Sequence, residues 1–131
     1  MDPRGQPLHP RSGGKHVTAT REEAATLQLP PAARNALAAA GLTIAQMQAI
    51  KTHNPFAVND VLFARETGVD LTRMNNFGCS LVWGHPQAPM GTRAVIELIE
   101  ELALRGGGCG LFTGCAAGDT AMAVVVEVGD R

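Results

Sequence analysis

A strongly amphipathic segment covers residues 92–105. Val95, Leu98 and Leu102 recur at helical spacing on one face, and most of the charged side chains fall on the other face. Three glycines at 106–108 follow the segment and are typical of a helix end. The pattern predicts an α-helix over residues 92–105.

Two further segments have helical features. Pro31 precedes an alanine-rich run that ends at Gly41, and proline is favoured at the first position of a helix. Residues 56–67 carry apolar side chains at helical spacing and end before Gly68. We therefore predict about three helices in total.

The strand signals lie between and after these helices. Short apolar runs predict strands at residues 49–53 and 71–75, and residues 43–48 could form a helical turn before the first of them. Residues 109–113 and the β-branched run at 121–128 predict two further strands, joined most simply as a hairpin. This order predicts the α/β class, with a mixed sheet of about four or five strands covered by helices.

The domain boundaries follow from a change in composition. Residues 1–30 are expected to form a flexible arm, because the leader is rich in Pro and Gly. Within it, residues 16–23 could be a short strand or a loop, and residues 21–27 could equally form a helical turn. We expect one domain over residues 31–128 and a short tail at 129–131.

Composition narrows the class of protein. The chain has 131 residues, 45% hydrophobic content and a net charge of −1, so it offers no basic surface for nucleic acid or acidic membranes. Neither a membrane-length apolar run nor the apolar core of a signal peptide is present in the sequence. Three cysteines, an odd number without a Cys-x-x-Cys pair, favour reduced thiols and a cytoplasmic location.

The candidate chemistry centres on the Gly84-His85-Pro86 step. A residue before proline is held in extended geometry, so the turn orients the imidazole of His85. Pro89 and Gly91 delay the next helix to about Met90, which places His85 just ahead of a helix N-terminus. Acid–base chemistry is plausible at such a position.

The passage around His85 resembles the C-terminal half of the thiolase family, which includes acetyl-CoA acetyltransferases and sterol-carrier-type thiolases. The family's Asn, Gly, Gly-His-Pro and Arg positions match a set of residues in order: Asn75, Gly78, Gly84, His85, Pro86, Gly91 and Arg93. GLFTGCAAGD, at 110–119, is similar to the segment that carries the second thiolase cysteine. THNPFA, at 52–57, is similar to the Asn-Glu-Ala-Phe segment in its histidine variant. Three segments in order make the resemblance specific.

The resemblance implies roles for three residues. His85 would take the proton from a nucleophilic thiol and help to hold the thioester oxygen as charge develops there. Cys115 would be the second thiol, which moves a proton to and from the α-carbon or leaving group. His53 would line the oxyanion site directly or hold a water there. The substrate-binding positions implied in the same way are Asn54, Phe56, Gly84 and Gly118.

The resemblance also implies a coenzyme A thioester as substrate and no tightly bound cofactor or metal. The family's nucleophilic cysteine belongs to its N-terminal half, and this chain has no matching segment. We therefore expect the C-terminal half of an acyltransferase, which acts in acyl transfer, Claisen condensation or thiolysis. It would be inactive by itself and would need a thiolase N-terminal half or a homologous subunit, in an oligomer.

Several residues depart from the family pattern. Ala88, Met90 and the Ala116-Ala117 pair stand where the family has Gly or Ser, and they would narrow the acyl pocket. Cys79 is expected to serve in packing, and Cys109 has no assigned role.

Other interpretations remain open. His85 could be a turn histidine, Cys115 a small buried residue and His53 a strand-end side chain. A zinc site formed by Cys79, Cys115 and the two histidines is a minor alternative, because no ligand pair has close spacing. The whole chain could also be a noncatalytic thiolase-like subunit or a fragment that binds a partner.

Overall fold

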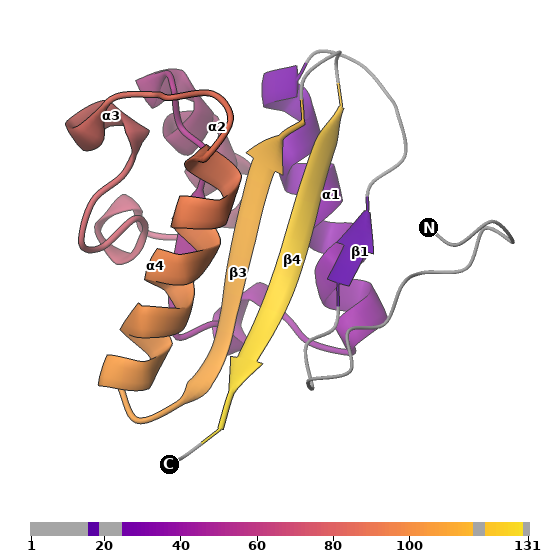
Figure 1. The fold of residues 1–131 in the computed structure, drawn as a ribbon. Coiled ribbons are helices and arrows are strands. Elements are labelled where there is room, and N and C mark those ends of the chain that lie inside the picture. Colours follow the sequence, from indigo (N-terminus) through magenta and orange to yellow (C-terminus); the bar gives the residue numbers. More distant parts are fainter. Residues whose placement is uncertain (1–15, 19–24, 117–119, 130–131) are drawn as a thin grey trace, which may run out of the picture.

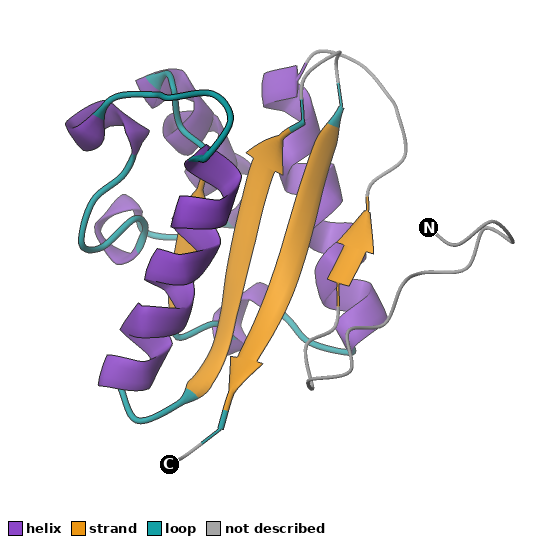
Figure 2. Cartoon of the chain, viewed as in Figure 1, coloured by secondary structure: helices purple, strands orange, loops and turns teal. Residues whose placement is uncertain are grey.

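The computed structural model describes residues 16–18, 25–116 and 120–129. Within these residues, four strands form one mixed sheet in the order β1-β4-β3-β2 (Figure 1). Helices pack on both faces of the sheet, which confirms the α/β class (Figure 2).

The sheet is built around one parallel pair of strands. β2 (Ala49–Thr52) pairs in parallel with β3 (Gly108–Cys115), so that Thr52 lies beside Thr113. β4 (Ala121–Val128) returns antiparallel to β3, which confirms the predicted hairpin. β1 (His16–Thr18) adds three residues to the outer edge of β4.

Helices α1 (Ala25–Ala40) and α2 (Ala57–Thr67) cover one face of the sheet, and α4 (Met90–Leu104) covers the other. Side-chain alternation along β3 explains the two layers: Leu111 packs in the α1 core, whereas Phe112 packs against α4. The helices predicted at 56–67 and 92–105 are therefore confirmed to within two residues. A short additional helix, α3 (Ser80–Trp83), lies between α2 and α4.

The first helix starts earlier than the sequence predicts. It begins at Ala25, and Pro30 and Pro31 lie inside it rather than at its start. A proline inside a helix removes a hydrogen bond. Burial of Ala33 and Ala36 against the sheet offsets that loss, because tertiary packing outweighs local propensity. β1 and the start of α1 thus lie within the segment expected to be an arm, while residues 1–15 and 130–131 lie outside the described residues.

The strand predicted at residues 71–75 is wrong. Leu71–Arg73 form a 3₁₀ turn, η2, because the Asp70 side chain accepts hydrogen bonds from the backbone N–H and hydroxyl of Thr72. Only Met74 makes a bridge to β2, through Ile50. The helical turn expected at 43–48 is present as η1 (Ile44–Gln46).

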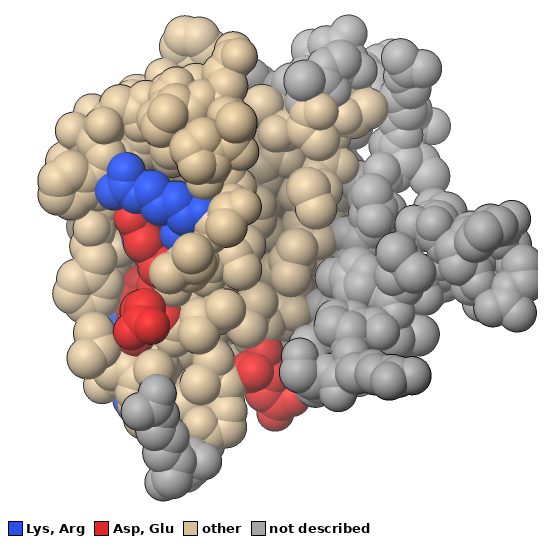
Figure 3. Space-filling view, in the orientation of Figure 1, with Lys and Arg blue, Asp and Glu red and all other residues tan. Residues whose placement is uncertain are grey.

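The sheet face beneath α4 is only partly covered. A groove of about 470 Å³ runs between α4 and the β3–β4 hairpin, and exposed Ile96 and Met122 line it. Figure 3 shows this side of the molecule, where most charged side chains lie over α4 and the rest of the described surface is largely uncharged. Among the described helices, none combines the length and the apolar character that crossing a membrane requires.

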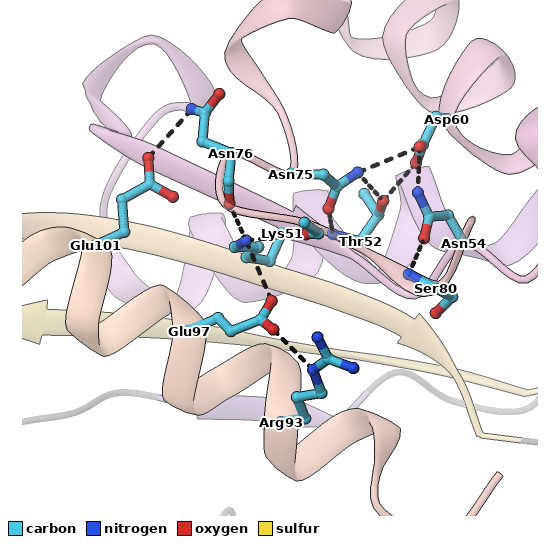
Figure 4. Close-up of polar contacts among 11 residues, drawn as sticks. Lys51, Thr52, Asn54, Asp60, Asn75, Asn76, Ser80, Arg93, Glu97 and Glu101 are labelled. Carbon is cyan, nitrogen blue, oxygen red and sulfur yellow. Dashed lines mark hydrogen bonds and ion pairs between the residues drawn. The ribbon is translucent and has the colours of Figure 1, made fainter. Parts of the chain in front are cut away.

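A polar network anchors the loops behind the carboxyl end of β2 (Figure 4). The Asp60 carboxylate accepts hydrogen bonds from the Thr52 hydroxyl, from Asn54 Nδ2 at 2.5 Å and from Asn75 Nδ2 at 3.2 Å. Asn54 Oδ1 in turn accepts from the backbone N–H of Ser80 at 3.0 Å. One carboxylate thereby ties β2 to the loop that follows it and to the loop that precedes α3.

A second network connects the loop before α3 to α4. Lys51 is 1% exposed and donates to the backbone carbonyls of Asn76 and Gly78. Its ammonium lies 3.3 Å from Glu97, which also pairs with Arg93 at 2.8 Å (Figure 4). A buried lysine needs such partners, because an unpaired buried charge is strongly destabilising.

Replacing Asp60 with alanine should lower the free energy of unfolding by about 2–4 kcal/mol, because three donors lose their shared acceptor. Urea denaturation measures this change. Glu100→Ala, on the exposed face of α4, is the control and should change stability by less than about 0.5 kcal/mol. Equal stability of the two variants would show that the network is not structural.

Candidate active site

Three chemically capable side chains come together from three separate segments. His53 directly follows β2, Cys115 is the last residue of β3, and His85 lies in the turn between α3 and α4. β2 and β3 are parallel, so their carboxyl ends lie at one edge of the sheet, which is where α/β proteins place their ligand sites.

The three side chains form a continuous line. Cys115 Sγ lies 3.2 Å from His53 Nδ1, and His53 Nε2 lies 3.3 Å from His85 Nδ1. The two imidazole rings are tilted by 53°, with centroids 4.6 Å apart. His53 is thus the central member, in contact with both of the others.

The line borders an open pocket. A cavity of about 360 Å³ is lined by His53, His85, Gln87, Cys115 and Ala116. His85 is exposed, whereas His53 and Cys115 are half-buried. The two residues expected to cooperate, His85 and Cys115, therefore lie on the same side of the sheet and are reachable from solvent.

A glycine allows the close approach of His53 to β3. The His53 N–H donates to Thr113 O at 2.9 Å, which extends the parallel pairing beyond β2. A Cβ at Gly114 would lie 2.7 Å from the His53 Cβ and 3.0 Å from the Phe112 ring. A side chain at Gly114 would therefore force His53 or Phe112 out of its present position.

The environment of His53 favours its neutral form. Burial lowers its pKa below the ordinary value of 6.5, and the neighbouring His85 lowers the pKa further, because two adjacent positive charges repel. A neutral imidazole has one N–H and one free lone pair. His53 can therefore donate a hydrogen bond at one nitrogen and accept one at the other.

The residues expected to bind substrate have different outcomes. Asn54 is fully buried, and its amide donates to Asp60 and accepts from the Ser80 backbone N–H. Its contact with substrate stays a prediction. Phe56 is 68% exposed at the start of α2. Gly84 has a φ of 85°, a left-handed geometry that suits glycine and turns the chain toward His85. Gly118 lies outside the described residues.

Two features of the site are absent from the sequence-based expectations. Gln87 lines the pocket, but nothing in the sequence distinguishes it from other loop glutamines. Asp60 anchors the loops near the site, but in the sequence it does not differ from other acidic residues on a helix. Only the folded arrangement identifies either residue.

The zinc alternative does not fit the geometry. His53 contacts Cys115 and His85 through opposite ring nitrogens, so the three side chains do not converge on one point. Within the described part of the chain, no group of three His, Cys, Asp or Glu side chains could hold a metal ion. Cys79 precedes α3 and Cys109 packs beside the α1 core, where burial raises the pKa of the Cys109 thiol.

The depressed pKa of His53 predicts a pH-dependent stability. The unfolded chain binds a proton at this residue near pH 6.5, but the folded chain binds it only at lower pH. The contribution of His53 to the free energy of unfolding is therefore fully present above pH 6.5 and is lost as the pH falls through the folded pKa. His53→Asn should remove this part of the decline between pH 7 and 5. Urea denaturation at several pH values measures it.

Asp70 provides the control for this pH dependence. Hydrogen bonds from Thr72 lower the pKa of Asp70 below its ordinary value of 3.8, so its contribution is lost only at more acidic pH. Asp70→Asn should therefore leave the slope between pH 7 and 5 unchanged. An unchanged slope in His53→Asn as well would contradict the assignment to His53.

Comparison with known proteins shows the family of this chain. The family model described as "Thiolase, C-terminal domain" matches residues 11–128. A 3-ketoacyl-CoA thiolase from Pseudoalteromonas atlantica is 39% identical over 109 residues, which cover 70% of this chain and 25% of the relative. This chain therefore spans about a quarter of the length of the curated relatives that it matches.

Solved structures show the same fold. The human mitochondrial 3-ketoacyl-CoA thiolase in complex with CoA matches with a TM-score of 0.74 and 28% identity, over 78% of this chain and 26% of that chain. The Bacillus anthracis acetyl-CoA acetyltransferase matches with a TM-score of 0.82 and 22% identity, over 87% of this chain and 29% of that chain, which supports the fold. Together with the family match over most of its length, these similarities show that the chain belongs to the thiolase family, as a thiolase C-terminal domain.

Proposed function

We propose that this chain supplies the histidine and cysteine side of a thiolase-type acyltransferase site that acts on acyl-CoA thioesters. The convergence of His85, His53 and Cys115 at one open pocket carries the proposal, because it gathers acid–base groups where a thioester could enter. The family membership supplies the reaction class.

Each side chain has a role that suits its position. In acyl transfer, the exposed His85 takes the proton from a nucleophilic thiol, whose sulfur bonds to the thioester carbonyl carbon as the carbonyl electrons move to oxygen. When the carbonyl re-forms, the C–S bond to coenzyme A breaks, and the coenzyme A thiolate leaves with the proton that His85 held. The imidazoles of His85 and His53 offer N–H groups toward the oxygen on which negative charge develops. Cys115 gives its proton to the α-carbon when the carbon–carbon bond breaks in thiolysis, and takes that proton in the condensation direction.

In this proposal the nucleophile comes from outside this chain. Cys79 and Cys109 lie outside the pocket formed around Cys115, and the matched relatives are about four times longer than the segment they share with this chain. We propose that a thiolase N-terminal half, or a homologous subunit in an oligomer, brings the nucleophilic cysteine. The exposed apolar groove beside α4 offers a surface on which such a partner could pack.

The relatives support a proposal for the substrate. One matched structure is a 3-ketoacyl-CoA thiolase in complex with CoA, which supports a coenzyme A thioester as the substrate of this site and no tightly bound cofactor. Phe56 and Gly84, near the carboxyl end of β2 and the start of the His85 turn, stay candidates for substrate contact. A cytoplasmic location and an oligomeric assembly stay part of the proposal.

A noncatalytic role is the second candidate. The same apolar groove could serve a thiolase-like subunit whose task is to bind its partner without taking part in chemistry. The two functions differ in one respect: only the first requires the line of side chains at the pocket.

Acyl transfer measurements distinguish the two. Thiolysis of acetoacetyl-CoA should be undetectable with this chain alone and should appear when a polypeptide carrying a thiolase N-terminal half is added. His85→Ala should then lower kcat/KM by about 100-fold or more, as expected for loss of a general base. Partner binding itself, measured by isothermal calorimetry, should be unchanged in this variant.

Cys109→Ala is the matched control, because Cys109 is a half-buried thiol outside the pocket. It should retain the full rate with the partner. Tight partner binding together with equal turnover in wild type and His85→Ala would establish the noncatalytic alternative instead.

A further inference from the structure

The central position of His53 carries an inference beyond the oxyanion role. Both of its ring nitrogens are engaged, Nδ1 with the Cys115 thiol and Nε2 with His85 Nδ1. We propose that His53 conducts a proton between Cys115 and His85. The proposal rests on the proposed function for the use of that proton, but the path itself can be tested without acyl transfer.

The transfer conserves every proton. At the start, the Cys115 S–H donates to His53 Nδ1, and the His53 Nε2–H donates to His85 Nδ1. The S–H bond breaks as an Nδ1–H bond forms, while the Nε2–H bond breaks as a new N–H bond forms on His85. The products are a Cys115 thiolate, a neutral His53 in the other tautomer and a His85 imidazolium.

The surroundings of His53 suit a bridge of this kind. Burial and the neighbouring His85 lower the pKa of His53, so the ring stays neutral and keeps one donor and one acceptor nitrogen. Among the described residues of the pocket, His53, His85 and Cys115 are the titratable groups, and Gln87 adds an uncharged amide. On α2, Asp60 directs its carboxylate at Thr52, Asn54 and Asn75.

Backbone contacts hold the bridge in place. The His53 N–H donates to Thr113 O at 2.9 Å, and Asn59 Nδ2 donates to His53 O at 3.4 Å. These bonds fix the main chain of His53 relative to β3, and therefore relative to Cys115. A proton moves along a hydrogen-bonded line only when its members stay within contact distance.

The proposed proton transfer requires a histidine at position 53. An asparagine at this position, the more usual residue in the family segment it resembles, could also contact Cys115 or His85. Its amide cannot accept a proton at one end and release one at the other, as an imidazole does by exchanging tautomers. The bridge would therefore distinguish thiolase domains with histidine here from those with asparagine.

Site-resolved alkylation of the intact chain tests the bridge. Iodoacetamide reacts with the thiolate, so the rate at Cys115 reports how readily that thiol loses its proton. Peptide mass spectrometry gives the rates at Cys115, Cys79 and Cys109 in one sample. The measurement is made at pH 7 on the wild type, His85→Ala, His53→Asn and the double variant.

The double-mutant cycle isolates the transmission through His53. With His53 present, His85→Ala should slow the alkylation of Cys115 by about threefold to tenfold, since the distal acceptor of the proton is lost. In the His53→Asn background, the same substitution should change the rate by less than about 1.5-fold. Unchanged rates at Cys79 and Cys109 serve as the control for folding.

An equal effect of His85→Ala in both backgrounds, or no effect in either, would overturn the bridge. Nitrogen-15 NMR of the histidine rings gives a second test that leaves both histidines in place. Cys115→Ala should shift the pH titration curves of His53 and His85 together, and a shift confined to His53 would also overturn it. These results stand whether or not acyl transfer is found with a partner.

Discussion

The parallel pairing of β2 with β3 is the constraint on which the site depends. Because the two strands run in the same direction, their carboxyl ends meet at one edge, and the His53 N–H continues the pairing by one residue to Thr113. Because Gly114 has no side chain, His53 has room to lie close to β3. Contact between an imidazole and the Cys115 thiol is thus a consequence of strand register and one missing Cβ.

Polar contacts hold the loop that precedes α3 and the His85 turn. Asp60 and Lys51 each bind several groups of the loops that lie between β2 and α3, and both act from half-buried or buried positions. Such networks are stable only when every member is satisfied, but they fix direction more strictly than apolar packing does. These networks therefore tie the loop before α3 to β2, α2 and α4 next to a pocket that is open to solvent.

Helices cover the two faces of the sheet to different extents. The face that packs on α1 and α2 contains a closed core, whereas the face below α4 leaves a groove with exposed Ile96 and Met122. A domain that spans about a quarter of the length of its relatives would be expected to leave such a surface. The groove lies on the face where the proposed partner would pack.

Local pattern was sufficient for the elements whose signals are strong. The amphipathic helix ending near Leu104, the β3–β4 hairpin and the Gly84-His85-Pro86 turn were all predictable, because each depends on periodicity or on the geometry of Gly and Pro. The resemblance to thiolases also singled out His53, His85 and Cys115. Their roles stay predictions.

Tertiary structure decided the rest. Packing of alanines on the sheet extended the first helix past Pro30 and Pro31. The 3₁₀ turn at 71–73, by contrast, depends on a local cap by Asp70 that the apolar pattern did not indicate. The burial of Asn54 against Asp60, and the position of His53 between two partners, depend on contacts between residues far apart in the chain. Sequence determined which groups could react, but only the fold, through strand register and close approach, decided which of them touch.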